Sequence, residues 1–284
     1  MRVAVTGASG FVGRHVVAAL ARRGVEVVAS SRHRPRDLPV GIQHVALDIA
    51  EPGEAFDRLG RPDAIVHLAW GGLPNYRSLH HFETELPLQY AFLRGLVESG
   101  AERLLVAGTC YEYGMQDGQL GEDMNGFPTN PYGFAKLTLL RQLELLRAVK
   151  PFALTWARLF YSYGDDQAPT SIYSLLHAAV ARGDSRFAMS AGEQLRDYLP
   201  IETATDRIAM LAGRCGDGIL NICSGVPVSI RALVERWIAA NDWTIVPDLG
   251  RYPYPDYEPL AFWGRATKLE ALYAAPLGSE TRTS

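Results

Sequence analysis

The sequence has little excess charge, no long apolar run and few cysteines, and each shortage excludes a class of protein. Its apolar stretches are interrupted by glycine and charged residues before they reach the length of a membrane-spanning helix. Acidic side chains number 31 and basic ones 28, so the net charge of -3 gives no reason to expect a polyanionic partner. We therefore expect neither a membrane protein nor a nucleic-acid-binding protein.

Cysteine is scarce as well. The three cysteines, Cys110, Cys215 and Cys223, cannot all pair and do not have the spacing of metal ligands. They predict reduced thiols and no metal site, as is typical of a cytoplasmic protein. The chain begins with a strand pattern, without a signal peptide ahead of it, which agrees with a cytoplasmic location.

What is present is an alternation of short apolar runs and amphipathic helical patterns. The runs are continuously apolar, so we expect a parallel sheet that is buried on both faces by helices, the α/β Rossmann doubly wound fold. The predicted strands cover residues 3–6, 25–30, 44–47, 64–68, 103–108, 152–158 and 220–223. The predicted helices cover residues 14–23, 84–99, 131–148, 171–182 and 229–240.

We predict two parts in the chain. Residues 1–160 form a dinucleotide-binding Rossmann domain, and residues 161–284 form mainly a smaller C-terminal α/β substrate-binding lobe, with part of 195–225 returning to the first domain. Residues 247–259 contain four prolines and three tyrosines. They indicate an ordered loop, because the aromatic rings need packing partners.

A glycine-rich segment joins the first strand to the first helix. There Gly7 allows a tight turn, Gly10 lets the backbone approach a pyrophosphate, and Gly13 lets the helix pack closely on the strand. The helix N-terminus offers unpaired N–H groups to phosphates. The alternative is a tight turn without a ligand. The predicted cofactor contacts here are Gly7, Ser9, Gly10, Phe11, Val12 and Gly13.

The end of the second strand indicates which cofactor is bound. It carries Ser31 and Arg32, with no carboxylate before Asp37. A hydroxyl and a guanidinium suit the 2′-phosphate of NADP(H), whereas NAD(H) sites place a carboxylate there for the ribose. We therefore expect NADP(H) rather than NAD(H). The alternative is a solvated basic loop.

Two further strand ends are placed to line the cofactor. Asp48 and Ile49 follow the third strand at the adenine edge, and Leu68, Ala69 and Trp70 follow the fourth. Asp48 has an alternative role as a turn residue. Trp70 has one as a packing aromatic.

The predicted chemical site is a Tyr–Lys pair. Tyr132 and Lys136 are four residues apart, so they share one face of a helix for which Asn130 provides the cap. A neighbouring ammonium should favour the phenolate, and the phenol can then exchange a proton with a carbinol oxygen during hydride transfer. Thr109 ends the fifth strand and can bind the same oxygen, although a strand-end cap is its alternative role.

These segments together resemble the extended short-chain dehydrogenase/reductase superfamily, in its NAD(P)-dependent sugar epimerase/dehydratase family. The match runs in family order over about residues 1–270. The matching pieces are residues 6–13, His67-Leu68-Ala69, Thr109 with Tyr113-Gly114, Tyr132-Gly133-Phe134-Ala135-Lys136, Arg158 with Tyr163-Gly164, Arg196-Asp197-Tyr198, and residues 220–225.

The resemblance implies a catalytic triad of Thr109, Tyr132 and Lys136 and a nicotinamide cofactor, with Phe160 among its contacts. It also implies a nucleotide-sugar substrate held by the C-terminal part, and a homodimer formed through the helices at 84–99 and 131–148. The nearest departure lies beside the catalytic threonine, where Cys110 and Tyr111 replace the acidic residues of the dehydratases. Elimination of water therefore lacks its carboxylic acid and carboxylate.

Other departures narrow the reaction. Tyr161 replaces an asparagine that often contacts the sugar nucleotide, and the chain is short for the group. With the basic segment at Arg32, the sequence resembles most the NADPH-dependent reductases of 4-keto-6-deoxy nucleotide sugars. The alternatives are a nucleotide-sugar 4-epimerase with bound NAD and a non-catalytic NADP(H) sensor, which should lack the Tyr–Lys pair.

The predicted substrate-binding residues are Cys110, Tyr111, Tyr161 and Arg196. Arg196 can pair with a diphosphate, or alternatively form a salt bridge between the lobes with Asp197 or Glu202. The tyrosines can line a sugar pocket or pack against their neighbours. Cys110 is interpreted as a small pocket filler, because no nearby base is visible in the sequence.

Overall fold

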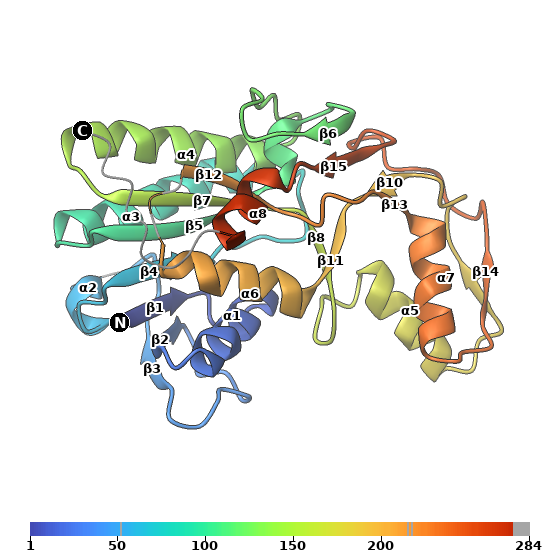
Figure 1. Ribbon diagram of the computed structural model, residues 1–284, viewed down its shortest axis with the longest axis horizontal. Helices are drawn as coiled ribbons and strands as arrows, with labels where there is room; N and C mark the ends of the chain where they lie inside the picture. Colours follow the sequence, from blue (N-terminus) through green and yellow to red (C-terminus); the bar gives the residue numbers. More distant parts are fainter. Residues whose placement is uncertain (52, 215, 217, 275–284) are drawn as a thin grey trace.

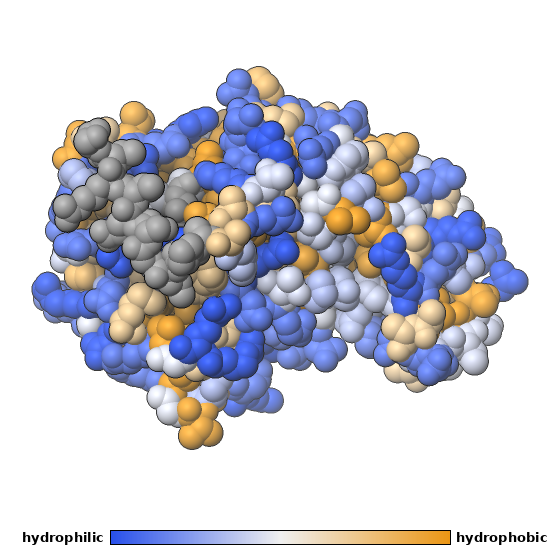
Figure 2. All heavy atoms as spheres, in the orientation of Figure 1, coloured by the Kyte–Doolittle hydropathy of each residue, from blue (hydrophilic) through white to orange (hydrophobic). Residues whose placement is uncertain are grey.

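A computed structural model describes residues 1–51, 53–214, 216 and 218–274. It shows a layered α/β body and a smaller lobe at one side of it (Figure 1). Figure 2 shows an indentation between the two parts and a surface of mixed polarity. None of the helices in these ranges is both long and apolar enough to cross a membrane. Cys215 lies outside the described residues, and Cys110 and Cys223 are free thiols.

A seven-stranded parallel sheet forms the body of the described chain. Its order is β12-β7-β5-β4-β1-β2-β3, so the order in which the chain adds strands to the sheet reverses at the β1–β4 pair. Ligands bind at such a reversal, outside the carboxyl ends of the strands. The strands are β1 (Arg2–Thr6), β2 (Glu26–Ser31), β3 (Gln43–Ala46), β4 (Ala64–His67), β5 (Arg103–Thr109), β7 (Ala153–Leu159) and β12 (Gly218–Ile222).

Helices bury both faces of this sheet, because both sets of alternating side chains are apolar. Ala4, Leu104 and Trp156 pack under one helical layer, whereas Val3, Val5 and their neighbours pack under the other. The first layer contains α2 (Ala55–Arg58), α3 (Leu86–Glu98) and α4 (Pro131–Val149), and the second contains α1 (Phe11–Arg22), α6 (Ile201–Ala212) and α8 (Thr267–Ala274) (Figure 1). The predicted Rossmann fold is confirmed.

The lobe has its own small core. Leu176, Phe187 and Trp237 are buried there among side chains from two helices and the strands beside them. Ser171 and Ser229 each accept a backbone N–H bond at the start of a helix. The lobe elements are α5 (Ile172–Ala181), β9 (Arg186–Ala188), α7 (Ile230–Ala240) and β14 (Val246–Asp248).

Short paired strands connect the body and the lobe. The pairs are β8 (Tyr161–Tyr163) with β11 (Tyr198–Pro200), β10 (Leu195–Arg196) with β13 (Val228–Ser229), and β6 (Gly118–Leu120) with β15 (Phe262–Gly264). The sequence did not predict these strands, nor α6. The helix predicted at 84–99 begins earlier than expected, as a π-helical turn, η1 (His81–Glu85), that continues into α3.

Candidate functional site

The turn between β1 and α1 is built for close approach of the backbone. Gly7 has a φ of 73°, and a Cβ atom there would lie 2.6 Å from the amide nitrogen of Ala69. A Cβ on Gly13 would collide with the carbonyl of Gly7. Gly10 forms the N-cap of α1 without a side chain, so the first turn of the helix opens toward whatever lies in front of it.

A groove of about 480 Å³ lies in front of this turn. It runs past the ends of β1, β2, β3 and β4, at the reversal point of the sheet. The predicted cofactor contacts that line it are Gly7, Ser9, Gly10, Ser31, Arg32, Asp48, Ile49, Leu68, Ala69 and Trp70. Lining residues that the sequence analysis missed include His80, Thr84 and Glu85, all near the π-helical turn.

Some predicted cofactor residues do not line the groove. Val12 packs against the core under α1, and the ring of Phe11 packs against His15 on its own helix. Gly13 is buried in the same helix. Phe160 lies instead in a buried cluster with Tyr113 and Phe262, because β7 ends one residue earlier and the chain turns inward there.

The end of β2 carries the residues that should distinguish the cofactors. Ser31 is buried, and its hydroxyl donates to the carbonyl of His33 at 2.7 Å. Arg32 is exposed on the groove wall. Asp48 both lines the groove and accepts a bond from the amide of Ala50 at 3.0 Å, so its turn role and its groove position coexist.

Trp70 joins the groove to the predicted chemical residues. The ammonium of Lys136 lies 3.9 Å from the centre of the Trp70 ring, and the Tyr132 ring meets Trp70 edge-on at 5.9 Å. The indole N–H of Trp70 donates to Nδ1 of His81 at 3.1 Å. Tyr132 and Lys136, which are also predicted cofactor contacts, do not themselves line the groove, but both contact Trp70, which does.

Tyr132 is deeply buried, and burial raises the pKa of its phenol far above the ordinary value. A hydrogen bond with Thr109 shifts this pKa downward by less than burial raises it. The sequence analysis expected Lys136 to lower the Tyr132 pKa. The structure differs, because the ammonium donates to the carbonyl of Ala107 at 2.9 Å and lies over Trp70.

Lys136 is affected by burial in the opposite direction. Burial lowers its pKa to about 7, against a partial rise from the charges of Glu112 and Glu85. The protonation of this amine therefore changes near neutral pH.

Thr109 serves as a cap. Its side chain accepts a bond from the amide of Tyr111 at 3.3 Å, at the start of the 3-10 helix η2 (Cys110–Tyr113). Glu112 completes a capping box by accepting from the Thr109 amide at 2.8 Å. The cap and the contact with Tyr132 both hold the threonine at the end of β5.

Glu112 is a buried carboxylate that the sequence analysis missed. Its side chain is 0% exposed and forms an ion pair with Arg158 at 2.7 Å. The indole of Trp156 donates to it at 2.9 Å. The Arg158 guanidinium lies over the ring of Tyr113, whose hydroxyl donates to Asn221 at 2.8 Å. The Thr-x-x-Glu spacing from Thr109 was the available signal.

A second buried carboxylate, Glu258, contacts three of the predicted substrate residues. The hydroxyls of Tyr111 and Tyr161 each lie 2.5 Å from its Oε1 atom. The guanidinium of Arg196 pairs with Oε2 at 2.8 Å.

The salt-bridge alternative for Arg196 is therefore realised with a different partner than the sequence suggested. Asp197 accepts the backbone amides of Ser224 and Gly225 instead. Cys110 is buried, and burial raises the pKa of its thiol, which agrees with a pocket filler rather than a nucleophile.

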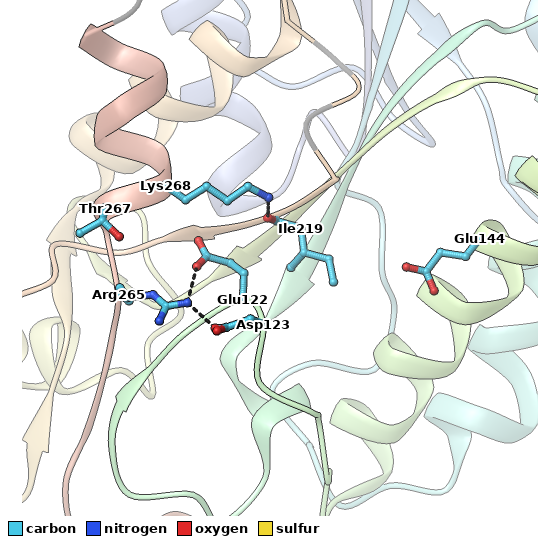
Figure 3. Close-up of a pocket in the computed structure, with 7 residues that line it drawn as sticks. All are labelled: Glu122, Asp123, Glu144, Ile219, Arg265, Thr267 and Lys268. Carbon is cyan, nitrogen blue, oxygen red and sulfur yellow. Dashed lines mark hydrogen bonds and ion pairs between the residues drawn. The ribbon is translucent and has the colours of Figure 1, made fainter. Parts of the chain in front are cut away.

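Another hollow, of about 670 Å³, lies on the outer side of the body near α8 (Figure 3). None of the predicted site residues lines it. Arg265 pairs with Asp123, and the amine of Lys268 donates to the carbonyl of Ile219 at 2.6 Å. These charges are already engaged, so we assign no ligand to this hollow. The described ranges contain no group of three or more His, Cys, Asp or Glu side chains that could hold a metal ion.

Comparison with known families and proteins shows the family of the chain and relatives of the same fold. The NAD dependent epimerase/dehydratase family matches residues 3–223. A dTDP-6-deoxy-L-talose 4-dehydrogenase (NAD(+)) of Aggregatibacter actinomycetemcomitans is 31% identical over 93% of this chain and 99% of its own length. A dTDP-6-deoxy-L-talose 4-dehydrogenase (NAD(P)(+)) of Kitasatospora kifunensis is 27% identical over 90% of this chain and 83% of its own.

A solved structure shares the whole architecture. It is that of MoeE5 in complex with UDP-glucuronic acid and NAD, with a TM-score of 0.81 and 27% identity, over 98% of this chain and 95% of that one. The similarity extends through the lobe as well as the sheet.

Proposed function

Because the chain belongs to the NAD dependent epimerase/dehydratase family and is an enzyme of short-chain dehydrogenase/reductase type, we propose that it transfers a hydride between NADP(H) and C4 of a nucleotide sugar. The net reaction proposed is reduction of a 4-keto-6-deoxy sugar. The observation that carries the proposal is the placement of Tyr132 and Lys136 against Trp70, at the end of a groove that begins at Gly7.

The groove fits a dinucleotide. Its turn leaves no room for a side chain at Gly7, and the N-terminus of α1 faces it, as a pyrophosphate requires. The nicotinamide ring, when bound, supplies the hydride.

The chain's own residues handle the proton. Thr109 and Tyr132 would bind the carbonyl oxygen, and Tyr132 would give it a proton as the carbon accepts the hydride. Since burial raises the pKa of Tyr132, the phenol carries its proton at neutral pH, so a proton is present for the transfer. Lys136 would support the ring of Trp70 and meet the cofactor ribose. The assignment of Thr109, Tyr132 and Lys136 as the catalytic triad is part of this proposal.

The preference for NADP(H) rests on Ser31 and Arg32 at the end of β2. Both line the groove, and the six residues of β2 include no carboxylate after Glu26 at its first position. The two dehydrogenases similar to this chain are named for NAD(+) and for NAD(P)(+), so the family accommodates either cofactor.

A cytoplasmic homodimer is also part of the proposal. The surface of α4 exposes apolar side chains at Phe134, Leu145 and Val149, with exposed fractions of 49%, 73% and 81%. Pairing of α3 and α4 with a second copy would cover them. Sedimentation equilibrium measures the assembly, and a monomer at micromolar concentration would contradict it.

The function is tested with a panel of dTDP- and UDP-linked 4-keto-6-deoxy sugars, following the absorbance of NADPH. One NADPH should be consumed per sugar reduced. Protein that carries bound NAD and turns over without added cofactor would instead indicate an epimerase.

Replacement of Tyr132 tests the chemical role. Tyr132→Phe should lower kcat by a factor of about a hundred or more, because the proton donor is lost, and should leave NADPH binding nearly unchanged. Tyr90→Phe removes a phenol from α3 that does not line the groove and provides the control. Normal turnover by Tyr132→Phe would remove this residue from the mechanism.

A further inference from the structure

Residues 249–261, which join β14 to β15, cross beside Tyr111, whose ring contacts Tyr132. We call them the crossing segment. Its Tyr257 ring packs on Tyr111 at 6.5 Å, and the guanidinium of Arg77 lies over Tyr257 at 5.2 Å. The Tyr111 ring in turn meets Tyr132 at 6.2 Å. The crossing segment therefore covers the side of the predicted site where the sugar would bind, which we call the sugar side.

Glu258 is the inward-pointing acid of this segment. Its two oxygens accept four hydrogen bonds from three side chains: the phenols of Tyr111 and Tyr161 at 2.5 Å each, and the Arg196 guanidinium at 2.8 and 3.2 Å. The side chain of Glu258 is 9% exposed and that of Arg196 is 4% exposed. Arg196 also lies over the ring of Phe262. The carboxylate is held in a site built of donors.

Such a set of donors also suits a phosphate. An arginine fork with two hydroxyls binds carboxylate and phosphate oxygens in the same way, through charge-assisted hydrogen bonds. In the structure Glu258 uses the donors that a substrate diphosphate would need. The three donor side chains cannot fully bind the Glu258 carboxylate and a diphosphate at the same time, so the two anions must compete.

We propose that Glu258 is a specificity-determining residue that fills the anion subsite at Arg196 until a nucleoside diphosphate group displaces it. This inference rests on the proposed nucleotide-sugar function and deepens it. A diphosphate carries enough charge and enough oxygens to replace the carboxylate at all three donors. A free sugar has no such anion, and a monophosphate has a smaller one. The segment thus selects diphosphate-linked sugars.

Displacing Glu258 costs free energy, and this cost weakens the apparent affinity for the diphosphate ligand. A ligand that binds only the form with Glu258 released has its apparent Kd raised in proportion to how rarely that form is populated. Neutralising Glu258 should remove this penalty, since an amide is a weaker partner for a guanidinium than a carboxylate is.

The experiment measures UDP, dTDP and UMP binding to the full chain by calorimetry. Glu258→Gln should lower the Kd for UDP or dTDP by about tenfold, and the Kd for UMP by less. Glu258→Asp, which keeps the charge but is one methylene shorter, should give an intermediate value. Arg196→Ala should weaken diphosphate binding in both backgrounds. The matched control is Asp256→Asn, which removes a carboxylate from the same segment, where it pairs with Arg77 at the surface.

The outcomes separate the two levels of the proposal. Unchanged or weaker UDP and dTDP binding by a folded Glu258→Gln would overturn the displacement role while leaving the nucleotide-sugar function intact. Equal gains for UMP and UDP would overturn the selectivity. If neither the unaltered chain nor the variant binds UDP or dTDP, although NADPH binds, the proposed substrate class is itself wrong. Thermal unfolding and NADPH affinity establish that each variant is folded.

Discussion

Two buried carboxylates, Glu112 and Glu258, are each paired with an arginine, and they differ in where their partners come from. Glu112 is held by groups of the sheet body: the Thr109 amide, Trp156 and Arg158. Glu258 is held by side chains from three separate segments, those of Tyr111, Tyr161 and Arg196.

The origin of its partners determines what each ion pair can do. A carboxylate whose partners sit on adjacent parallel strands fixes the end of β5, and nothing outside the protein can replace it. A carboxylate on a connecting segment, bound by donors that suit a phosphate, can be exchanged for a ligand. Burial alone does not distinguish a structural ion pair from one that exchanges with a ligand.

The largest expected effect comes from removing the carboxylate of Glu112. Glu112→Ala leaves Arg158 charged and unpaired in the core, so the free energy of unfolding in urea should fall by about 3–5 kcal/mol. Glu258→Ala should cost less, about 1–3 kcal/mol, because the Arg196 guanidinium keeps the carbonyls of Leu195 and Leu260 as hydrogen-bond partners. Equal losses would show that the two carboxylates do not differ in this way.

Lys136 gives a second test of the difference between the two carboxylates, because its pKa is raised by the charge of Glu112 and not by that of Glu258. The folded pKa of about 7 lies below the ordinary 10.5. Between these values the unfolded chain binds the extra proton, so stability should rise with pH across this window.

Relative to Lys136→Met, the unaltered protein should therefore gain about 3–4 kcal/mol from pH 7 to pH 10, measured by urea unfolding. Lys150→Met, at the far end of α4, is the control. A flat difference between the unaltered protein and Lys136→Met would show that Lys136 keeps its charge in the fold.

The smallest expected effect concerns an exposed arginine. Arg32 is exposed on the groove wall, unlike Arg158 and Arg196. Arg32→Ala should weaken NADPH about tenfold and NADH little, since a guanidinium recognises the 2′-phosphate. Arg36→Ala, outside the groove, is the control for lost positive charge. Equal weakening of NADPH and NADH would refute the NADP(H) preference.

The sheet and the groove could be predicted because their signals are local. Gly7, Gly10 and Gly13 follow a strand directly, and each strand end places its next residues at one edge of the sheet. Most of the residues that line the groove can therefore be predicted from their position at the end of a strand.

The sugar side could not be predicted in the same way. Glu258 is 147 residues from Tyr111 and 97 from Tyr161, and sequence spacing carries no information about such a contact. The pKa of Tyr132 was misjudged for a similar reason. The i, i+4 spacing places Lys136 on the same helix face, but burial and the Ala107 carbonyl, which come from the rest of the fold, determine the outcome.

The path of the chain between body and lobe has a consequence for how the protein can be divided. After β7 the chain leaves for the lobe, returns to lay α6 beside α1 and β12 beside β7, and then leaves again for α7 (Figure 1). A fragment that stops near residue 160 would keep the glycine turn but expose the edge of β7 and the apolar side of α1. The proposed boundary is therefore no place to cut. The sheet is completed by β12, which follows the first part of the lobe in the chain, so a cut at residue 160 would remove this strand from beside β7.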